Sequence, residues 1–285
     1  MESGRFMTQT VPHPSPPARA AVTQPFRKAL GELFLLATRL RGYKVSGFPI
    51  LAYHSVADDP GPDVETVAPA DFGRQMAWLA ARGFEVVTVS EVVQAMARPS
   101  ANGRVVGVTF DDGYRDNLLI AFPILQRYRF LASFYISTAY IGGLSVWNPS
   151  DYIGHRPMLA AAEVRVLSDA GHEIGSHAHH HIDLTSVDGA LVDEELSQSQ
   201  RILAGVTGKP VFAFAPPHSR SNEAVVQRAA RLGYTHMVRG GRFTANPAGT
   251  SPFDLRRITI QRGDSLREFA RKVSGAYQLL AFRDR

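Results

Sequence analysis

Val105-Val106-Gly107-Val108-Thr109-Phe110-Asp111-Asp112-Gly113 is the stretch around which the rest of the chain is organised. Its first six residues are almost all apolar or β-branched, which is typical of a strand buried on both faces. Two carboxylates follow where this strand ends, and Gly113 permits the turn after them. Because consecutive strand side chains point in opposite directions, Asp111 and Asp112 can have different roles, one holding a metal ion and the other handling a proton. Alone, an Asp-Asp-Gly sequence is usually a turn.

The composition indicates a globular α/β protein. The chain has 285 residues, 45% of them hydrophobic, which suits one large α/β domain or two small ones. It contains no cysteine, so disulfides and thiolate metal sites are excluded. The net charge of +5 favours acidic neighbours such as anionic lipid or a charged glycan. No basic stripe with interleaved aromatic residues indicates nucleic acid, and no apolar run approaches the ~18–20 residues that span a bilayer.

The first 46 residues differ from the rest of the chain. Residues 1–25 are rich in proline and lack apolar periodicity, which predicts disorder, and they lack the apolar core of a secretory signal. Residues 26–41 have the spacing of an amphipathic helix. This helix either packs on the domain itself or makes a peripheral contact with an anionic membrane or a partner protein. We therefore expect a tail and helix over 1–46, a catalytic domain over 47–285, and a cytoplasmic location, in solution or at the inner membrane face.

Strand-like segments alternate with helical ones through the remaining chain. The strands are expected at 48–53, 105–110, 131–136, 211–215 and 235–238. This alternation predicts a mostly parallel sheet. Since no glycine-rich phosphate loop follows an early strand, a barrel is favoured over an open sheet. In a barrel the carboxyl ends of the strands meet at one face, where loops build the active site.

A histidine run, His177-Ala178-His179-His180-His181, supplies candidate metal ligands. His177 and His181 are four residues apart, and on a helical turn these positions share one face. Two imidazoles and one carboxylate form a triad that leaves positions open for water and substrate. The alternative is a solvated polar loop. The barrel arrangement favours the metal site, because the Asp-Asp pair, the histidine run and Pro217-His218 each follow a predicted strand.

Together these motifs resemble the polysaccharide deacetylases, the carbohydrate esterase family 4 that includes the nodulation-type chitooligosaccharide deacetylases. The resemblance rests on residues 109–113 and 175–184 and covers about residues 48–273. It implies a distorted (β/α) barrel with fewer than eight regular strands, to which the N-terminal helical extension is added. It also implies that Asp111 is the catalytic base, and that Asp112, His177 and His181 bind the metal.

A third motif, residues 214–218, matches the segment that supplies the oxyanion donor in this family, and it departs from the family pattern. Ala215 stands where several relatives have arginine, and His218 where they have tyrosine. The arginine usually steadies the base, and Arg257 is a candidate replacement; it could equally be a surface residue. No Leu-x-His occurs near the C-terminus, where many members keep their general acid. The sequence leaves His218 and His54 as candidates for that role.

The function that follows is metal-dependent hydrolysis of N-acetyl groups on an N-acetylated polysaccharide or oligosaccharide. Zinc is the default ion for a His/His/Asp site, and cobalt, manganese or iron fit the same ligands. Pro217 and Trp147 are the candidate substrate-binding residues; Trp147 lies in a long loop that either covers a ligand or packs on its own side chains. The alternatives are a non-catalytic glycan-binding module that retains the metal, and a metal-dependent amidase acting on small amides.

Overall fold

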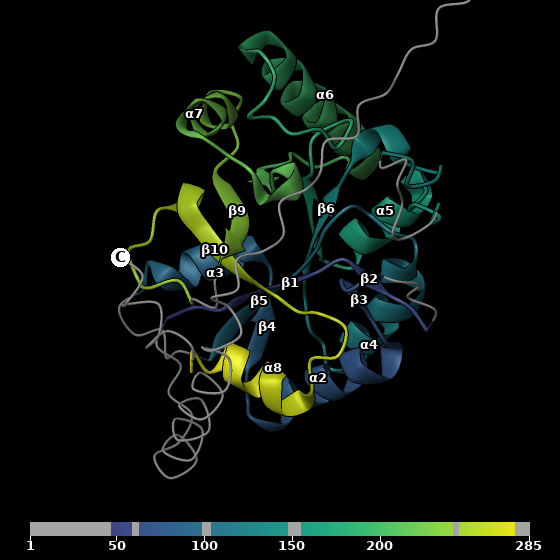
Figure 1. The fold of residues 1–285 in the computed structure, drawn as a ribbon, viewed down its shortest axis with the longest axis vertical. Coiled ribbons are helices and arrows are strands. Elements are labelled where there is room, and N and C mark those ends of the chain that lie inside the picture. The colour runs from purple at the N-terminus through teal and green to yellow at the C-terminus, as the bar shows by residue number, and fades with distance from the viewer. Residues whose placement is uncertain (1–46, 59–62, 99–103, 148–154, 242–244, 277–285) are drawn as a thin grey trace, which may run out of the picture.

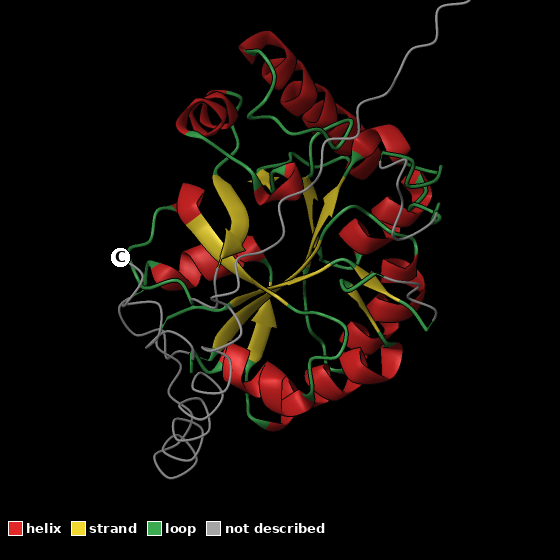
Figure 2. Ribbon diagram, in the orientation of Figure 1, coloured by secondary structure: helices red, strands yellow, loops and turns green. Residues whose placement is uncertain are grey.

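The computed structural model describes residues 47–58, 63–98, 104–147, 155–241 and 245–276. Strands lie at the centre, and helices form an outer layer around them (Figures 1 and 2). The predicted tail and amphipathic helix of residues 1–46, with its membrane or partner contact, lies outside the described residues. No helix in the described part of the chain is both long enough and apolar enough to cross a bilayer.

The strands are short and nearly all buried. They are β1 (Ile50–Tyr53), β2 (Ser55–Val56), β3 (Thr66–Val67), β4 (Glu85–Val87), β5 (Val105–Phe110), β6 (Ser133–Ile136), β7 (Glu173–Ser176), β8 (Ala213–Phe214), β9 (His236–Gly241) and β10 (Leu255–Thr259). β5 has the bounds that its apolar run predicts. β8 is shorter than the expected 211–215, and β9 extends beyond the expected 235–238.

The helices lie between the strands in sequence. The α-helices are α2 (Pro69–Ala81), α3 (Val89–Met96), α4 (Phe122–Arg127), α5 (Ala161–Asp169), α6 (Gly189–Thr207), α7 (Glu223–Arg231) and α8 (Leu266–Val273). Shorter helical turns are η1 (Asn117–Ala121), η2 (Thr138–Tyr140), η3 (Pro217–Ser219) and η4 (Pro252–Asp254). α3 shows how local sequence starts a helix, since Thr88 and Glu91 form a reciprocal capping box at its first turn.

Seven of the described strands close into a parallel barrel. The ring runs β1-β10-β9-β8-β7-β6-β5 and closes because β5 also pairs with β1. β4 pairs outside this ring, with the first half of β5. The chain therefore adopts the predicted distorted (β/α) barrel with fewer than eight regular strands. β2 and β3 form a separate two-stranded sheet.

The alternation of side chains along β5 divides the core into two layers. Val106, Val108 and Phe110 pack outward, in the large apolar cluster between the strands and the helices. Val105 points into the barrel, where it joins a smaller cluster that includes Val92 of α3. α3 thus closes the amino-terminal end of the barrel with apolar side chains. Polar side chains are left at the carboxyl ends of the strands, where the candidate site lies.

Candidate active site

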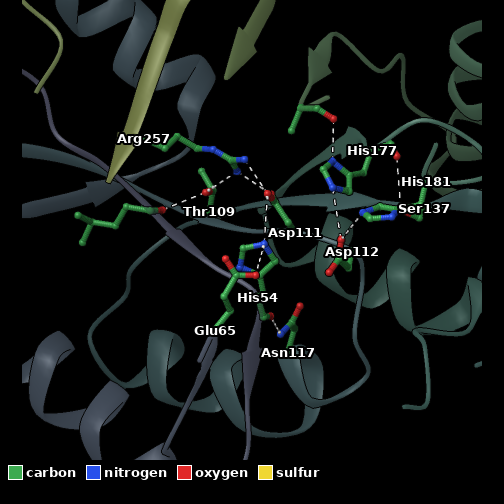
Figure 3. A network of polar contacts seen from close by, with 12 residues as sticks. His54, Glu65, Thr109, Asp111, Asp112, Asn117, Ser137, His177, His181 and Arg257 are labelled. Carbon is green, nitrogen blue, oxygen red and sulfur yellow. Dashed lines mark hydrogen bonds and ion pairs between the residues drawn. The ribbon is translucent and has the colours of Figure 1, made fainter. Parts of the chain in front are cut away.

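Asp111 and Asp112 lie at the carboxyl end of β5, and both contact residues of the barrel mouth (Figure 3). The Asp111 side chain points into the barrel, as the alternation along β5 requires. Asp112 would point outward by simple alternation, but its backbone is left-handed, with a φ of 73°. Gly113 follows with a φ of 91°, and a Cβ there would lie 3.1 Å from the Ile136 side chain. The turn therefore requires glycine and keeps both carboxylates at the mouth.

Asp112, His177 and His181 form a cluster that could hold a metal ion. Oδ1 of Asp112 lies 3.3 Å from Nε2 of His177 and 3.2 Å from Nε2 of His181. Each of the three residues is at most 9% exposed. Figure 3 shows both imidazole rings directed at the carboxylate. The three predicted metal ligands are thus brought together at one point.

The hydrogen bond made by His177 orients this residue for binding a cation. Nδ1 of His177 lies 2.7 Å from the backbone oxygen of Ala215. A carbonyl oxygen only accepts, so Nδ1 is the donor and Nε2 is the ring nitrogen that faces Asp112. In a neutral imidazole this nitrogen carries the lone pair that binds a metal ion. Oδ1 of Asp112 has no hydrogen-bond donor in the described part of the chain. A cation between these lone pairs satisfies all of them, and the ligand set suits a zinc-type ion with open positions.

The histidine run is not helical, so the helical reason given for the pairing of His177 and His181 is wrong. His177 directly follows β7, and residues 177–183 form an irregular loop. Ala178 and His181 have left-handed backbones, with φ of 61° and 58°. These two turns fold the loop back on itself and bring the ring centroids of His177 and His181 to 5.1 Å. Tight loop geometry therefore achieves what a helical turn was expected to achieve.

Arg257 lies inside the barrel and holds Asp111 with two hydrogen bonds. The two terminal guanidinium nitrogens, Nη1 and Nη2, each donate to one carboxylate oxygen at 2.6 Å. One of them also donates to Oγ1 of Thr109 at 3.1 Å. Arg257 is 1% exposed, so it is not the surface residue that was the alternative. Burial alone would raise the pKa of Asp111, but the charge of Arg257 and its hydrogen bonds to the carboxylate outweigh burial and lower it.

His54 lies on the other side of Asp111 (Figure 3). Its Nε2 is 3.5 Å from Oε2 of Glu65 and 4.0 Å from Oδ2 of Asp111. Burial opposes its protonation, yet the charges of Glu65, Asp112 and Asp111 outweigh burial and raise the pKa of His54. The backbone at His54 is fixed by Asn117, whose Nδ2 donates to the His54 backbone oxygen at 2.8 Å.

The remaining predicted residues border the metal cluster. The His218 ring centroid lies 4.8 Å from that of His181, and its side chain is exposed. Its backbone φ is 56°, within the turn η3 that begins at the buried Pro217. The Trp147 ring centroid lies 4.7 Å from that of His181 and 4.8 Å from that of Tyr140, and both ring pairs are tilted. Trp147 therefore packs beside the candidate ligand His181 rather than away from the site.

Backbone strain is concentrated around the cluster. Among the described non-glycine residues with positive φ, five border the site: Asp112, Ala178, His181, His218 and Ser219. Such conformations cost roughly 1–3 kcal/mol each and persist where surrounding contacts impose them. The strain indicates that the folded barrel fixes the ligand positions, since the local sequence does not favour these conformations.

Three residues of the site were not found by the sequence analysis. Tyr114 makes a side-chain hydrogen bond with Asp112. Burial raises the pKa of Tyr114, and the nearby Asp112 carboxylate raises it further. Glu65 contacts His54, and Glu195 contacts the backbone of the loop that contains His177 and His181. Tyr114 could have been suspected from its position just after Gly113. Glu65 and Glu195 are far from the motifs in sequence, and no local pattern marks them.

The chain is similar to proteins that are named as deacetylases. A family model described as "Polysaccharide deacetylase" matches residues 98–237. YxkH of Bacillus subtilis (strain 168), whose name places it among the polysaccharide deacetylases, is 27% identical over 78% of this chain and 74% of its own length. The peptidoglycan-N-acetylmuramic acid deacetylase PdaA of the same organism is 25% identical, over 53% of this chain and 52% of its own.

The solved structures agree on the fold. The Streptococcus pyogenes deacetylase PplD, solved in complex with acetate, superimposes with a TM-score of 0.68, at 24% identity, over 79% of this chain and 97% of its own. The matched family segment contains β5, the Asp-Asp pair and residues 177–181, and therefore Asp111 and all three candidate metal ligands. Arg257, His54 and Glu65 lie outside it. From its motifs, its barrel and these similarities, the chain belongs to the polysaccharide deacetylase family.

Proposed function

We propose that the protein is a divalent-metal-dependent hydrolase that removes N-acetyl groups from an N-acetylated glycan. One observation supports this most strongly: a carboxylate locked by a buried arginine stands next to a separate cluster of one carboxylate and two imidazoles. The first group suits proton transfer, and the second suits a cation. Deacetylation of an amide needs both, because an acetamide is a poor electrophile and water a poor nucleophile.

The side chains divide the chemistry between them. Asp112, His177 and His181 would hold the ion, which when bound supplies Lewis-acid polarisation and an acidified water. Asp111 takes the proton from the attacking water. Arg257 keeps Asp111 ionised and fixes its orientation, since the guanidinium lowers the pKa of the buried carboxyl. The backbone at Pro217 and His218 would border the developing oxyanion, as residues 214–218 match the family motif.

The leaving amine needs a proton, and the geometry favours His54 over His218 as its donor. His54 lies between Glu65 and Asp111, and these carboxylates favour its protonated form. It also stands beside the proposed base, where a proton from the water can be passed on. His218 instead meets the candidate metal ligand His181 edge to face, on the other side of the cluster.

A sugar ring can pack against the apolar residues beside the metal cluster. Trp147 is partly exposed, and Leu144 and Val146 just before it are 45% and 50% exposed. An aromatic face with apolar neighbours can cover the non-polar face of a sugar while the metal cluster addresses its acetamido group. Zinc is the first choice of ion, with cobalt, manganese or iron as replacements. Substrates named for relatives, such as the N-acetylmuramic acid of peptidoglycan, are the first to assay.

Acetate release tests the proposed function. Full-length protein would be incubated with N-acetylglucosamine oligomers, chitin-type polymers and peptidoglycan, with and without prior chelator treatment. We expect acetate only from metal-loaded protein, and restoration of release when zinc is added back. Glycan binding without acetate release would support the non-catalytic module, and activity confined to small amides would support the amidase.

Substitutions of the two histidines identify the general acid. We expect His54→Gln to reduce acetate release by about 10²–10⁴-fold, because the leaving amine would lose its proton donor. His218→Asn is the comparison, since asparagine tolerates the left-handed backbone at this position. It should retain most of the activity. Steady-state rates of both variants decide the matter, and the reverse pattern would assign the acid to His218.

A further inference from the structure

The loop from His177 to His181, here called the histidine loop, is bound on all sides by hydrogen bonds. Its first amide donates to the backbone oxygen of Ile136 at 3.0 Å. The η2 amides of Thr138 and Ala139 donate to the oxygens of Ala178 and His179, at 3.3 and 3.0 Å. Backbone groups thus account for one side of the loop. Thr138 and Tyr140 add side-chain hydrogen bonds on this side. The amides of His179 and His180 are bound instead by one side chain from a distant helix.

That side chain is Glu195 of α6. Its Oε2 accepts from the backbone amides of His179 and His180, at 2.9 and 2.8 Å. Its Oε1 lies 2.6 Å from Nδ1 of His180. Glu195 is 2% exposed and lies on the buried face of α6, together with Val192 and Leu196. One carboxylate therefore contacts two consecutive amides of the loop that joins the two metal-ligand histidines.

The burial of this carboxylate requires compensation. An ionised carboxyl removed from water is costly unless hydrogen-bond donors replace its hydration. Consecutive amides that point the same way form an anion-binding concavity, and charge-assisted hydrogen bonds to them are strong. In the histidine loop, the left-handed backbones of Ala178 and His181 lie on either side of these two amides. The anion that fills the concavity belongs to the protein itself.

We infer that Glu195 is a positioning residue for the metal site, which fixes the histidine loop in the conformation that presents His177 and His181 to a cation. This inference rests on the proposed function, since it assumes that these histidines bind a metal. Without the carboxylate, the two amides would need other partners, and the strained backbones on either side would relax. Part of the free energy of cation binding would then be used to order the loop, and the affinity of the protein for the cation would fall.

Substitutions at Glu195 should therefore weaken cation binding in a graded way. We expect Glu195→Ala to reduce affinity by about 10–100-fold, the range seen when residues that orient metal ligands are removed. Glu195→Gln should lose less, because its amide oxygen can still accept from both backbone amides. Glu194→Gln is the matched control, because Glu194 lies on the same helix but is exposed. The Glu194→Gln protein should bind the cation as tightly as the wild type does.

The measurement is a cobalt titration of chelator-treated, full-length protein, followed by visible absorption, with thermal melting of the same metal-free samples. The expected result is weaker binding and an altered cobalt spectrum in Glu195→Ala, partly restored in Glu195→Gln. Equal affinity in the wild type and both Glu195 variants would overturn the inference, even if melting temperatures fell, since that pattern is purely structural. Absence of cobalt binding in the wild type would overturn the proposed metal site, and this inference with it.

Discussion

Asp111→Asn is expected to reduce acetate release by roughly 10²–10⁴-fold while the protein still binds its metal. Asparagine has nearly the shape of aspartate but cannot accept a proton from the attacking water. Asp111 is outside the metal cluster, and its two oxygens are occupied by Arg257. The loss should therefore appear in turnover and not in metal content. Elemental analysis and steady-state rates on the same preparation would measure both.

Asp112→Asn is the control for this prediction. It changes the neighbouring carboxylate by the same chemistry, but at a residue whose Oδ1 lies 3.3 and 3.2 Å from the candidate ligands His177 and His181. We expect it to lose metal and turnover together. Equal metal loss in the two variants would show that both carboxylates ligate the ion. Wild-type turnover in Asp111→Asn would remove Asp111 as the base.

Arg257→Met is expected to destabilise the fold by about 3–5 kcal/mol near neutral pH. The substitution leaves the Asp111 carboxylate buried, at 3% exposure, without its cation. Since global stability is typically about 5–15 kcal/mol, this is a large fraction of the total. Urea unfolding of the wild type and the variant would measure it. Arg256→Met is the comparison: Arg256 is half exposed and pairs with Asp254, so its loss should cost at most about 1 kcal/mol.

The effect of Arg257→Met should depend on pH. In the wild type the folded-state pKa of Asp111 is lowered, so the pair stabilises the fold at neutral pH, and this contribution is lost as pH falls through that lowered pKa. In the variant, burial acts without the opposing charge and raises the pKa of Asp111 above its unfolded value. The buried, ionised Asp111 then destabilises the variant at neutral pH, and its protonation in acid removes this loss of stability. The stability gap between the two proteins should therefore shrink as pH falls.

A double variant separates the lost charge from the lost packing. Asp111→Asn combined with Arg257→Met removes both charges, so neither is left buried alone. We expect the double variant to be more stable at neutral pH than Arg257→Met, because neighbouring sites that share one interaction are not additive. A double variant less stable than Arg257→Met would show that packing of the arginine side chain, rather than its charge, supports the barrel.

The sequence alone determined those features that depend on neighbouring residues. The apolar run of residues 105–110 is a strand with the expected bounds, because burial on both faces needs a continuous apolar segment. Asp111 and Asp112 fall at its end for the same reason. The alternation of strands and helices predicted a parallel barrel, and a barrel brings the ends of its strands to one mouth. His177 and His181 do lie close together, as their spacing predicted, but through an irregular loop and not through a helical turn.

Only the tertiary structure decided where the charged residues of the site face. Arg256 and Arg257 are adjacent in sequence, and the register of β10 places the second inside the barrel and leaves the first half exposed. Glu194 and Glu195 are distinguished in the same way by the rotation of α6. His54 and Glu65 meet Asp111 through loops that no short pattern describes. Periodicity shows that a strand or helix has a buried face, but barrel closure and packing select which of two like-charged neighbours lies on it.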